Sequence, residues 1–143
     1  MKTQIVTLCF ALMFTSMLCA QKLNNKDVPA VVKSALESKY PQAKNVTWEK
    51  EKGNYEANWG GKSGEDNSVQ FTPTGEFIEI EKAISVSQLP KSIDSYVKEN
   101  YKGAKITEAG KVTDAKGKIS YEVEVNKKDL VFDEKGNFVK LED

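Results

Sequence analysis

The chain has 143 residues, of which 39% are hydrophobic and 29% charged, a composition typical of one globular domain. Its 21 acidic residues balance 21 basic ones, so there is no bulk positive charge to attract nucleic acid. The sequence contains no histidine and no arginine, which removes the commonest general base, the commonest transition-metal ligand and the bidentate anion clamp. We therefore expect no catalytic centre, no metal site, no cofactor and no nucleic-acid partner.

The first 20 residues have the pattern of a secretory signal peptide. Lys2 gives a positive start, an apolar run occupies residues 5–18, and Ala20 is a small residue suited to cleavage. The run is shorter than the roughly 20 residues that a membrane-spanning helix needs. The residues before Cys19 resemble a lipobox, but a leucine stands where lipoboxes carry a small side chain. We expect cleavage after Ala20, a periplasmic or secreted protein and no membrane span; a lipid anchor at Cys19 is the less favoured alternative.

Both cysteines, Cys9 and Cys19, lie within this leader. The mature domain would then have no thiol and no disulfide, which excludes thiol catalysis and disulfide exchange. A domain of about 120 residues can bury enough apolar surface to fold without such bridges.

An internal repeat organises the rest of the chain. VQFTPTGEFIEIE (residues 69–81) matches LVFDEKGNFVKLE (residues 130–142) at an offset of 61 residues, and YEANW matches YEVEV at an offset of 66. The change of offset indicates that the two copies differ in the lengths of their loops. We expect a single mature domain, residues 21–143, made of two repeats at about residues 26–82 and 87–143.

Each copy predicts a helix followed by an antiparallel meander. Apolar residues three and four apart predict helices that begin near Val28 and Leu89 and end at Pro41 and near Gly103. Short alternating runs predict eight strands, at residues 45–50, 55–59, 69–72, 77–81, 106–112, 119–125, 130–132 and 138–141. The expected class is α+β: two tandem helix-plus-four-strand repeats that form one antiparallel sheet, with both helices on one face.

The stretch WGGKSG, at residues 59–64, has the glycines and the lysine of a phosphate-binding loop. A true loop of that kind requires a further glycine at the position that Glu56 occupies, and it joins a parallel strand to a helix. Here the stretch joins two predicted strands of a meander, so we interpret it as a hairpin loop.

The repeated motifs resemble a known family. They consist of a Leu/Val-Pro helix start, a Tyr at the helix end, a strand that begins Tyr-Glu, and a Phe-x-x-x-Gly-x-Phe hairpin. This pattern is similar to that of the β-lactamase-inhibitor-like, PepSY-like family of exported bacterial proteins. The resemblance implies the fold of the β-lactamase inhibitor protein and the binding or inhibition of another exported protein without catalysis. That inhibitor carries disulfides, which the cysteine-free mature domain cannot form.

Strand alternation predicts which side chains point away from the helices. It places Glu56, Asn58, Gln70 and Glu79 on this outward face, with Phe77 as an aromatic island. Exposed aromatic residues among charges are typical of recognition surfaces. The candidate partner-binding face comprises Trp48, Phe77, Glu122, Glu124, Phe138 and Lys140. The alternative is that the phenylalanines cover the sheet or pack across a dimer interface.

We expect an exported, non-catalytic protein-binding module whose partner is another exported protein, with inhibition of a peptidase or other hydrolase as its specific form. The alternative is a structural or envelope-associated domain that homodimerises through its open sheet face. A small-ligand carrier would need a closed apolar cavity, which short alternating strands do not indicate. Glu122 and Glu124 could form a catalytic carboxylate pair, but in so charged a chain we interpret them as solvated surface.

Overall fold

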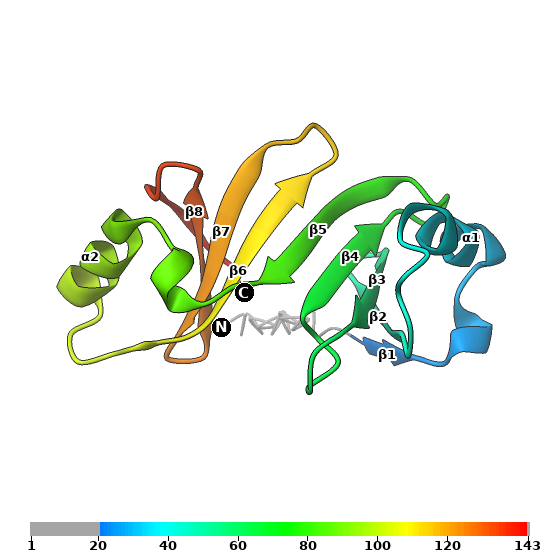
Figure 1. Cartoon of the computed structure of the whole chain (residues 1–143), viewed down its shortest axis with the longest axis horizontal. Coiled ribbons are helices and arrows are strands. Elements are labelled where there is room, and N and C mark those ends of the chain that lie inside the picture. The colour runs from blue at the N-terminus through cyan, green and yellow to red at the C-terminus, as the bar shows by residue number, and fades with distance from the viewer. Residues whose placement is uncertain (1–20, 143) are drawn as a thin grey trace, which may run out of the picture.

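The computed structural model describes residues 21–142 of the chain (Figure 1). The expected signal peptide, its cleavage site and Cys19 lie outside the described residues. The strands are β1 (Gln21–Leu23), β2 (Thr47–Glu51), β3 (Asn54–Trp59), β4 (Asn67–Phe71), β5 (Phe77–Ala83), β6 (Ile106–Asp114), β7 (Ile119–Val125), β8 (Lys128–Asp133) and β9 (Phe138–Glu142). The helices are α1 (Ala30–Lys39) and α2 (Lys91–Asn100), preceded by the 3-10 turns η1 (Asn25–Asp27) and η2 (Val86–Gln88).

The nine strands form one antiparallel sheet in which every strand pairs with its neighbour in the chain. The class is therefore α+β, as expected, and the sheet is its larger part. All eight expected strands are present, and a 3-10 turn, an α-helix and four strands follow one another twice along the chain. The edge strand β1 was not predicted, because its three residues are too few to show an alternating pattern.

The two helices are short and begin after prolines. Pro29 precedes α1 and Pro90 precedes α2, where a missing N–H costs nothing because no helical acceptor is available. Tyr40 and Tyr101 directly follow the two helices, and their backbone N–H groups donate to the carbonyls four residues back at 2.7 and 2.8 Å. Figure 1 shows the helices at the two outer ends of the molecule, with the strands between them. Within residues 21–142, neither helix combines the length and the apolar character needed to cross a bilayer.

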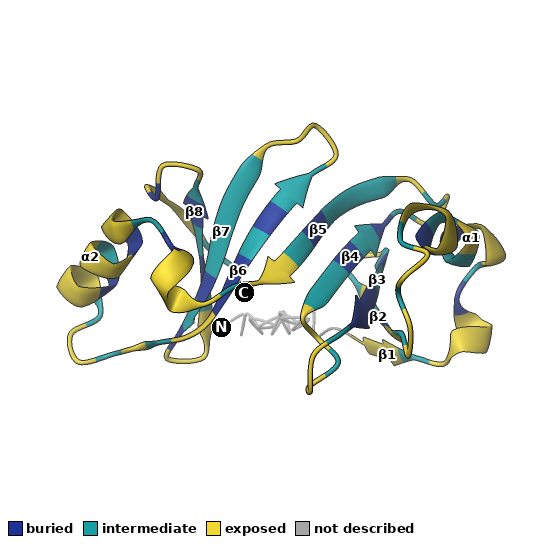
Figure 2. Ribbon diagram, viewed as in Figure 1, coloured by how far each residue is buried: buried dark blue, intermediate teal, exposed yellow. Residues whose placement is uncertain are grey.

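Each half of the chain has its own hydrophobic core, between one helix and one side of the sheet. Val32 and Leu36 of α1 are buried with residues of β2 to β5, and Ile93 and Val97 of α2 with residues of β6 to β8. Figure 2 shows these buried positions along the strands and the exposed residues on the outer turns of both helices. Since alternate residues of a strand point to opposite faces, the other face of the sheet is free for polar side chains.

The fold contradicts the expectation that Trp48, Phe77 and Phe138 lie on the outward face of the sheet. Trp48 is only 4% exposed and belongs to the first core, with Val32 of the helix. Phe77 contacts Phe71 and Tyr40 on the helix side, with ring centroids 6.1 and 6.4 Å apart. The outward placement of Trp48 and Phe77 is therefore wrong.

Phe138 also points to the helix side. Its ring stacks on Tyr96 of α2 at 4.9 Å and meets Phe132 edge to face at 5.8 Å. The cause is a shift of register between Val131 and Phe132, where β8 pairs with β9. Such a bulge inserts one residue and reverses the side to which the next side chains point. The equivalent shift between β4 and β5 follows Gln70 and turns Phe77 inward.

The WGGKSG stretch lies in the loop between β3 and β4, which are adjacent antiparallel strands. Gly60, Gly61 and Gly64 adopt positive φ angles there, a conformation that glycine adopts at little cost. The interpretation of this stretch as a hairpin loop is confirmed.

Candidate binding groove

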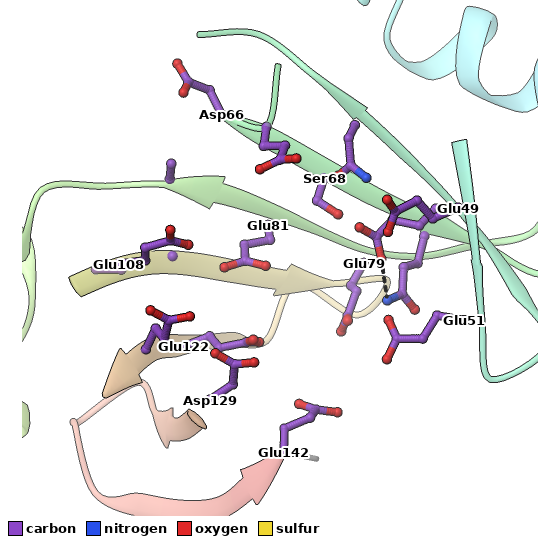
Figure 3. A pocket seen from close by; sticks show the side chains of 18 of the residues that line it. Glu49, Glu51, Asp66, Ser68, Glu79, Glu81, Glu108, Glu122, Asp129 and Glu142 are labelled. Atoms are coloured by element: carbon purple, nitrogen blue, oxygen red, sulfur yellow. Dashed lines mark hydrogen bonds between the residues drawn. The ribbon is translucent and has the colours of Figure 1, made fainter. Parts of the chain in front are cut away.

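A wide groove with a volume of about 760 Å³ lies on the face of the sheet opposite the two cores. We call it the acidic groove. Residues from β2 to β9 line it, so both halves of the chain contribute. Figure 3 shows its side chains projecting from successive strands into one common space. Its polar lining residues are Glu49, Glu51, Lys52, Asn54, Glu56, Asn58, Ser63, Glu65, Asp66, Ser68, Gln70, Glu79, Glu81, Glu108, Glu122, Glu124, Asp129 and Glu142.

The charge of the groove is almost entirely of one sign. Of the residues that the structure describes, 21–142, twelve acidic ones line it, against a single basic one, Lys52. The balanced total charge of the chain therefore conceals a strong segregation. A concave surface lined by one sign of charge concentrates its field and attracts ions of the other sign.

The strand register explains why the carboxylates gather. Glu108, Glu124, Asp129 and Glu142 stand opposite one another across β6, β7, β8 and β9. Like charges directly opposite in a sheet are destabilising, by roughly 0.2–1 kcal/mol for each pair. The fold therefore keeps an arrangement that its own stability does not favour.

A second row crosses the other half of the sheet, where Glu49 pairs with Glu56, and Glu79 pairs with Gln70. The Gln70 amide donates to Glu56 at 3.4 Å, so one of these charges has a hydrogen bond. The row continues the negative surface from the second half of the chain into the first.

Glu81 lies near the centre of the groove, on the strand β5 that joins the two halves. Its side chain crosses the neighbouring strand over Gly110, where any side chain would overlap with the carboxylate. Burial, together with the negative charges of Glu56 and Glu79, raises the pKa of Glu81 to about 7. The glycine thus provides the space in which this carboxylate rests.

Glu122 lies on β7 opposite Gly110 and faces the same space. Burial raises its pKa to about 8, with the charges of Glu81 and Asp129 adding to the rise. Burial also raises the pKa values of Glu79 and Asp129. The groove therefore holds protons near neutral pH that isolated carboxyl groups would have lost.

The one lysine of the groove links its two ends. Lys52 lies at the turn after β2, and its ammonium contacts Glu142 of β9 at 3.1 Å and Glu51 at 3.4 Å. Lys140 contacts Glu142 at the same distance of 3.1 Å. Burial acts to raise the pKa of Glu142, but the hydrogen bonds from Lys140 and Lys52 outweigh it and lower the pKa. Residues 90 positions apart thus meet at the rim, which shows how strongly the sheet curves.

Asn58 is a buried polar side chain in the lining of the groove. It is 6% exposed, and its side-chain amide makes no hydrogen bond to another residue of the described part of the chain. No side-chain polar atom sealed from solvent in residues 21–142 lacks a partner, so the amide must reach solvent through the groove. The Asn58 amide is therefore a hydrogen-bond donor and acceptor that a ligand in the groove can reach.

Three of the six residues predicted for the partner-binding face belong to this side of the sheet. Glu122 and Glu124 line the groove, and Lys140 of β9 pairs with Val131 beside it. The other three lie on the helix side, as described above. Glu81, Asp129 and Glu142 were missed, although the alternation that placed Glu79 outward also places Glu81 there.

Two other features bear on what the molecule could bind. Within residues 21–142, no group of three histidine, cysteine or acidic side chains is arranged to hold a metal ion. A smaller hollow of about 300 Å³ lies beside α1, and Trp48, Leu36 and Tyr40 are among its lining residues. It lies over the first core and apart from the acidic groove.

The fold and groove define a class of protein with a curved antiparallel sheet, helices on one face and an open polar surface on the other. The sequence model of one family, described as "Putative beta-lactamase-inhibitor-like, PepSY-like", matches residues 17–62 and 59–140. The chain belongs to this family, and the resemblance found in its motifs is confirmed. No curated protein matches the chain significantly.

Several solved structures share the fold. One, from Bacteroides eggerthii and described as a "putative periplasmic" protein, is 20% identical with a TM-score of 0.67 and covers 80% of this chain and 88% of its own. A DUF2874 family protein from Bacteroides uniformis is 21% identical, with a TM-score of 0.66 and the same coverage. A "BLIP-like" protein from Bacteroides fragilis is 21% identical, with a TM-score of 0.60, and covers 80% of this chain and 85% of its own. At these identities the likeness shows the fold alone.

Proposed function

We propose that this protein is an exported, non-catalytic protein-binding module that receives its partner in the acidic groove. The observation that carries the proposal is the groove itself, a concave hollow built from strands of both halves on the face opposite the helices. Its volume of about 760 Å³ suits a protruding segment of another protein, and its polar lining is suited to hydrogen bonds and ion pairs.

The comparisons support this proposal in two respects. The family is described as β-lactamase-inhibitor-like, and a solved structure of the same fold is described as BLIP-like, which favours protein binding. Another is described as periplasmic, which agrees with the secretory pattern of residues 1–20 and favours an exported partner. In its specific form the proposal is that the bound partner is a peptidase or other hydrolase and is inhibited. The two halves would then be tandem repeats that each supply one side of the groove.

Homodimerisation through the open face is the alternative, and the charge of the groove disfavours it. Two copies that met face to face would bring twelve carboxylates against twelve, with one lysine on each side. Like-charge juxtaposition across an interface costs several kcal/mol. We therefore favour a partner of different composition.

Affinity capture with a steric block of the groove tests the proposal. The chain is produced with its leader so that the cell processes it, immobilised, and exposed to envelope extract; any retained protein is identified, purified and bound again. Ser68→Trp fills the middle of the groove without changing charge, and Val31→Trp makes the same change on α1, where Val31 is 50% exposed. We expect Ser68→Trp to abolish binding of the purified partner and Val31→Trp to leave it intact.

The proposal is wrong if no protein is retained, or if the two tryptophan variants bind the purified partner equally. Hydrogen exchange of the complex with the unaltered protein locates the binding site without using Ser68→Trp, so it does not depend on the folding of that variant. Binding in the groove should protect the amides of the strands that line it. If the partner is a hydrolase, the same titration followed by its activity tests the inhibitory form.

A further inference from the structure

The acidic groove carries information about the chemistry of its occupant, beyond the fact that something binds there. Its carboxylates are not gathered at one point but spread over β2, β3, the loop before β4, and β5 to β9. A surface of distributed negative charge is complementary to several positive charges along a chain, because each cation then meets its own carboxylates.

The structure already shows how a cation is held in the groove. The ammonium of Lys52 lies between Glu51 and Glu142, at 3.4 and 3.1 Å, at the rim where the turn after β2 approaches β9. The remaining carboxylates, which include Glu81, Glu122 and Asp129, have no basic partner within 4.0 Å among residues 21–142. The rim of the groove thus has its charge compensated by a lysine, and the rest of the groove lacks an equivalent group within residues 21–142.

Asn58 is the second, independent observation. Its amide is 6% exposed, lies opposite Ser68 in the register and opens into the groove without a hydrogen-bond partner among residues 21–142. An amide can donate to a backbone carbonyl and accept from a backbone N–H of a segment laid across it. Because the amide reaches solvent through the groove, a peptide bound there would replace its contact with water by direct hydrogen bonds.

We propose that the occupant of the acidic groove is a lysine- or arginine-rich segment of the partner protein. Its cationic side chains pair with the carboxylates around Glu81 and Glu122, and its backbone hydrogen-bonds to the amide of Asn58. This inference rests on the proposed function and names the chemistry of the partner at the same site. The burial that raises the pKa values of Glu81 and Glu122 agrees with it, since a bound cation would restore their charged forms.

Binding of a defined polycation tests the inference. The probe is a fluorescein-labelled peptide of ten lysines, with peptides of ten glutamates and of alternating glycine and serine as controls, and binding is followed by polarisation at low and physiological salt. Binding is measured at pH 9, above the pKa values of both groups, where Glu81→Gln/Glu122→Gln removes two groove charges while keeping the shape of the side chains. Glu37→Gln/Glu99→Gln makes the same change in net charge on exposed positions of the two helices.

We expect the lysine peptide alone to bind, about tenfold more weakly to Glu81→Gln/Glu122→Gln and within about twofold of the unaltered protein to Glu37→Gln/Glu99→Gln. Asn58→Ala, which changes no charge, should weaken binding several-fold. Equal loss in both double variants would overturn the inference, because it would reduce binding to the net charge. So would the absence of binding, or displacement of the peptide by equimolar calcium or spermine, which would indicate a small-cation site.

The partner captured by the unaltered protein separates this inference from the proposed function. If that partner binds Glu81→Gln/Glu122→Gln as tightly as the unaltered protein, the cationic occupant is excluded while the binding function stands. If no partner is captured although the lysine peptide binds the groove, the proposed function fails while the groove keeps its chemistry.

Discussion

The ring of Phe138 in β9 stacks on the ring of Tyr96 in α2, with centroids 4.9 Å apart and an angle of 7° between the planes. This contact closes the second core at its outer end, where Tyr96 also meets Phe132 edge to face at 5.3 Å. It shows that the aromatic residues of the final hairpin stabilise the docking of a helix. The opposite face is left to polar groups.

Replacing Phe138 with alanine should lower stability without affecting the groove. Phe138 is 39% exposed, so we expect a loss of about 1–2 kcal/mol in the free energy of unfolding, less than for a fully buried phenylalanine. Urea denaturation measures this loss. Val139→Ala is the control, since Val139 is 57% exposed and its replacement should cost less than about 0.5 kcal/mol. Loss of lysine-peptide binding by folded Phe138→Ala would contradict the placement of this residue on the helix side.

Gly110→Ala should lower the pKa of Glu81. A methyl group at this position occupies the space where the carboxylate lies, so the side chain of Glu81 must swing out toward solvent. Burial is the largest cause of its raised pKa, and exposure should bring that value down from about 7 toward the 4.5 of a free glutamate. Carboxyl carbon NMR followed over a pH titration reports it directly.

Ser120→Ala, on the neighbouring strand β7, is the control for Gly110→Ala. Gly117→Ala is unsuitable because an alanine would be strained at the φ of +81° that Gly117 adopts. An unchanged pKa of Glu81 in Gly110→Ala would show that the glycine does not create its resting place. Stability should change by less than about 1 kcal/mol, because losing a flexible glycine offsets part of the displacement.

The sequence predicted much of this fold because its strands alternate regularly. Strand alternation places Tyr55, Ala57 and Trp59 in the core, and Glu56 and Asn58 between them on the outer face, as the structure has them. A side-chain period of two needs no tertiary information as long as the register is unbroken.

The prediction failed where the register breaks. The bulges that follow Gln70 and Val131 turn Phe77 and Phe138 toward the helices, and neither strand contains a residue that marks the irregularity.

The groove itself could not be predicted for a different reason. The meeting of Glu51, Lys52 and Glu142 depends on the curvature of the whole sheet, which sums small twists over nine strands.

The folded protein should lose stability as the pH rises from about 4.5 to about 8. Glu81 and Glu122 have pKa values of about 7 and about 8 in the folded state, against 4.5 for an ordinary glutamate. Between these limits the folded state binds more protons than the unfolded state, so raising the pH favours unfolding. The charged groups around this pair are Glu49, Glu51, Lys52, Glu56, Glu79, Glu108, Asp114, Glu124, Asp129, Lys140 and Glu142. Solvent in the open groove screens them, and we expect a loss on the order of 2 kcal/mol.

Urea denaturation at pH 5 and pH 8.5 measures this loss. In Glu81→Gln/Glu122→Gln the titrating pair is absent, and the difference between the two pH values should shrink to less than half. Glu37→Gln/Glu99→Gln should retain it. A stability that rises over this interval would mean that the groove carboxylates titrate at ordinary values.

Lys52→Ala should strengthen binding of the lysine peptide, in contrast to every carboxylate variant of the groove. The ammonium of Lys52 occupies Glu51 and Glu142, so its removal frees Glu51 for the incoming cations and leaves Glu142 with Lys140 as its one basic neighbour within residues 21–142. We expect an affinity gain of about threefold, which polarisation measures at low salt. The side chain of Lys52 is 43% exposed, and the lost ion pairs should cost less than about 1 kcal/mol of stability.

Lys91→Ala, at the exposed start of α2, makes the same change in net charge away from the groove and should leave the affinity within about twofold. If Lys52→Ala instead weakens binding, the lysine is part of the contact with the partner, and its ion pair with Glu142 serves to hold the rim of the groove in shape.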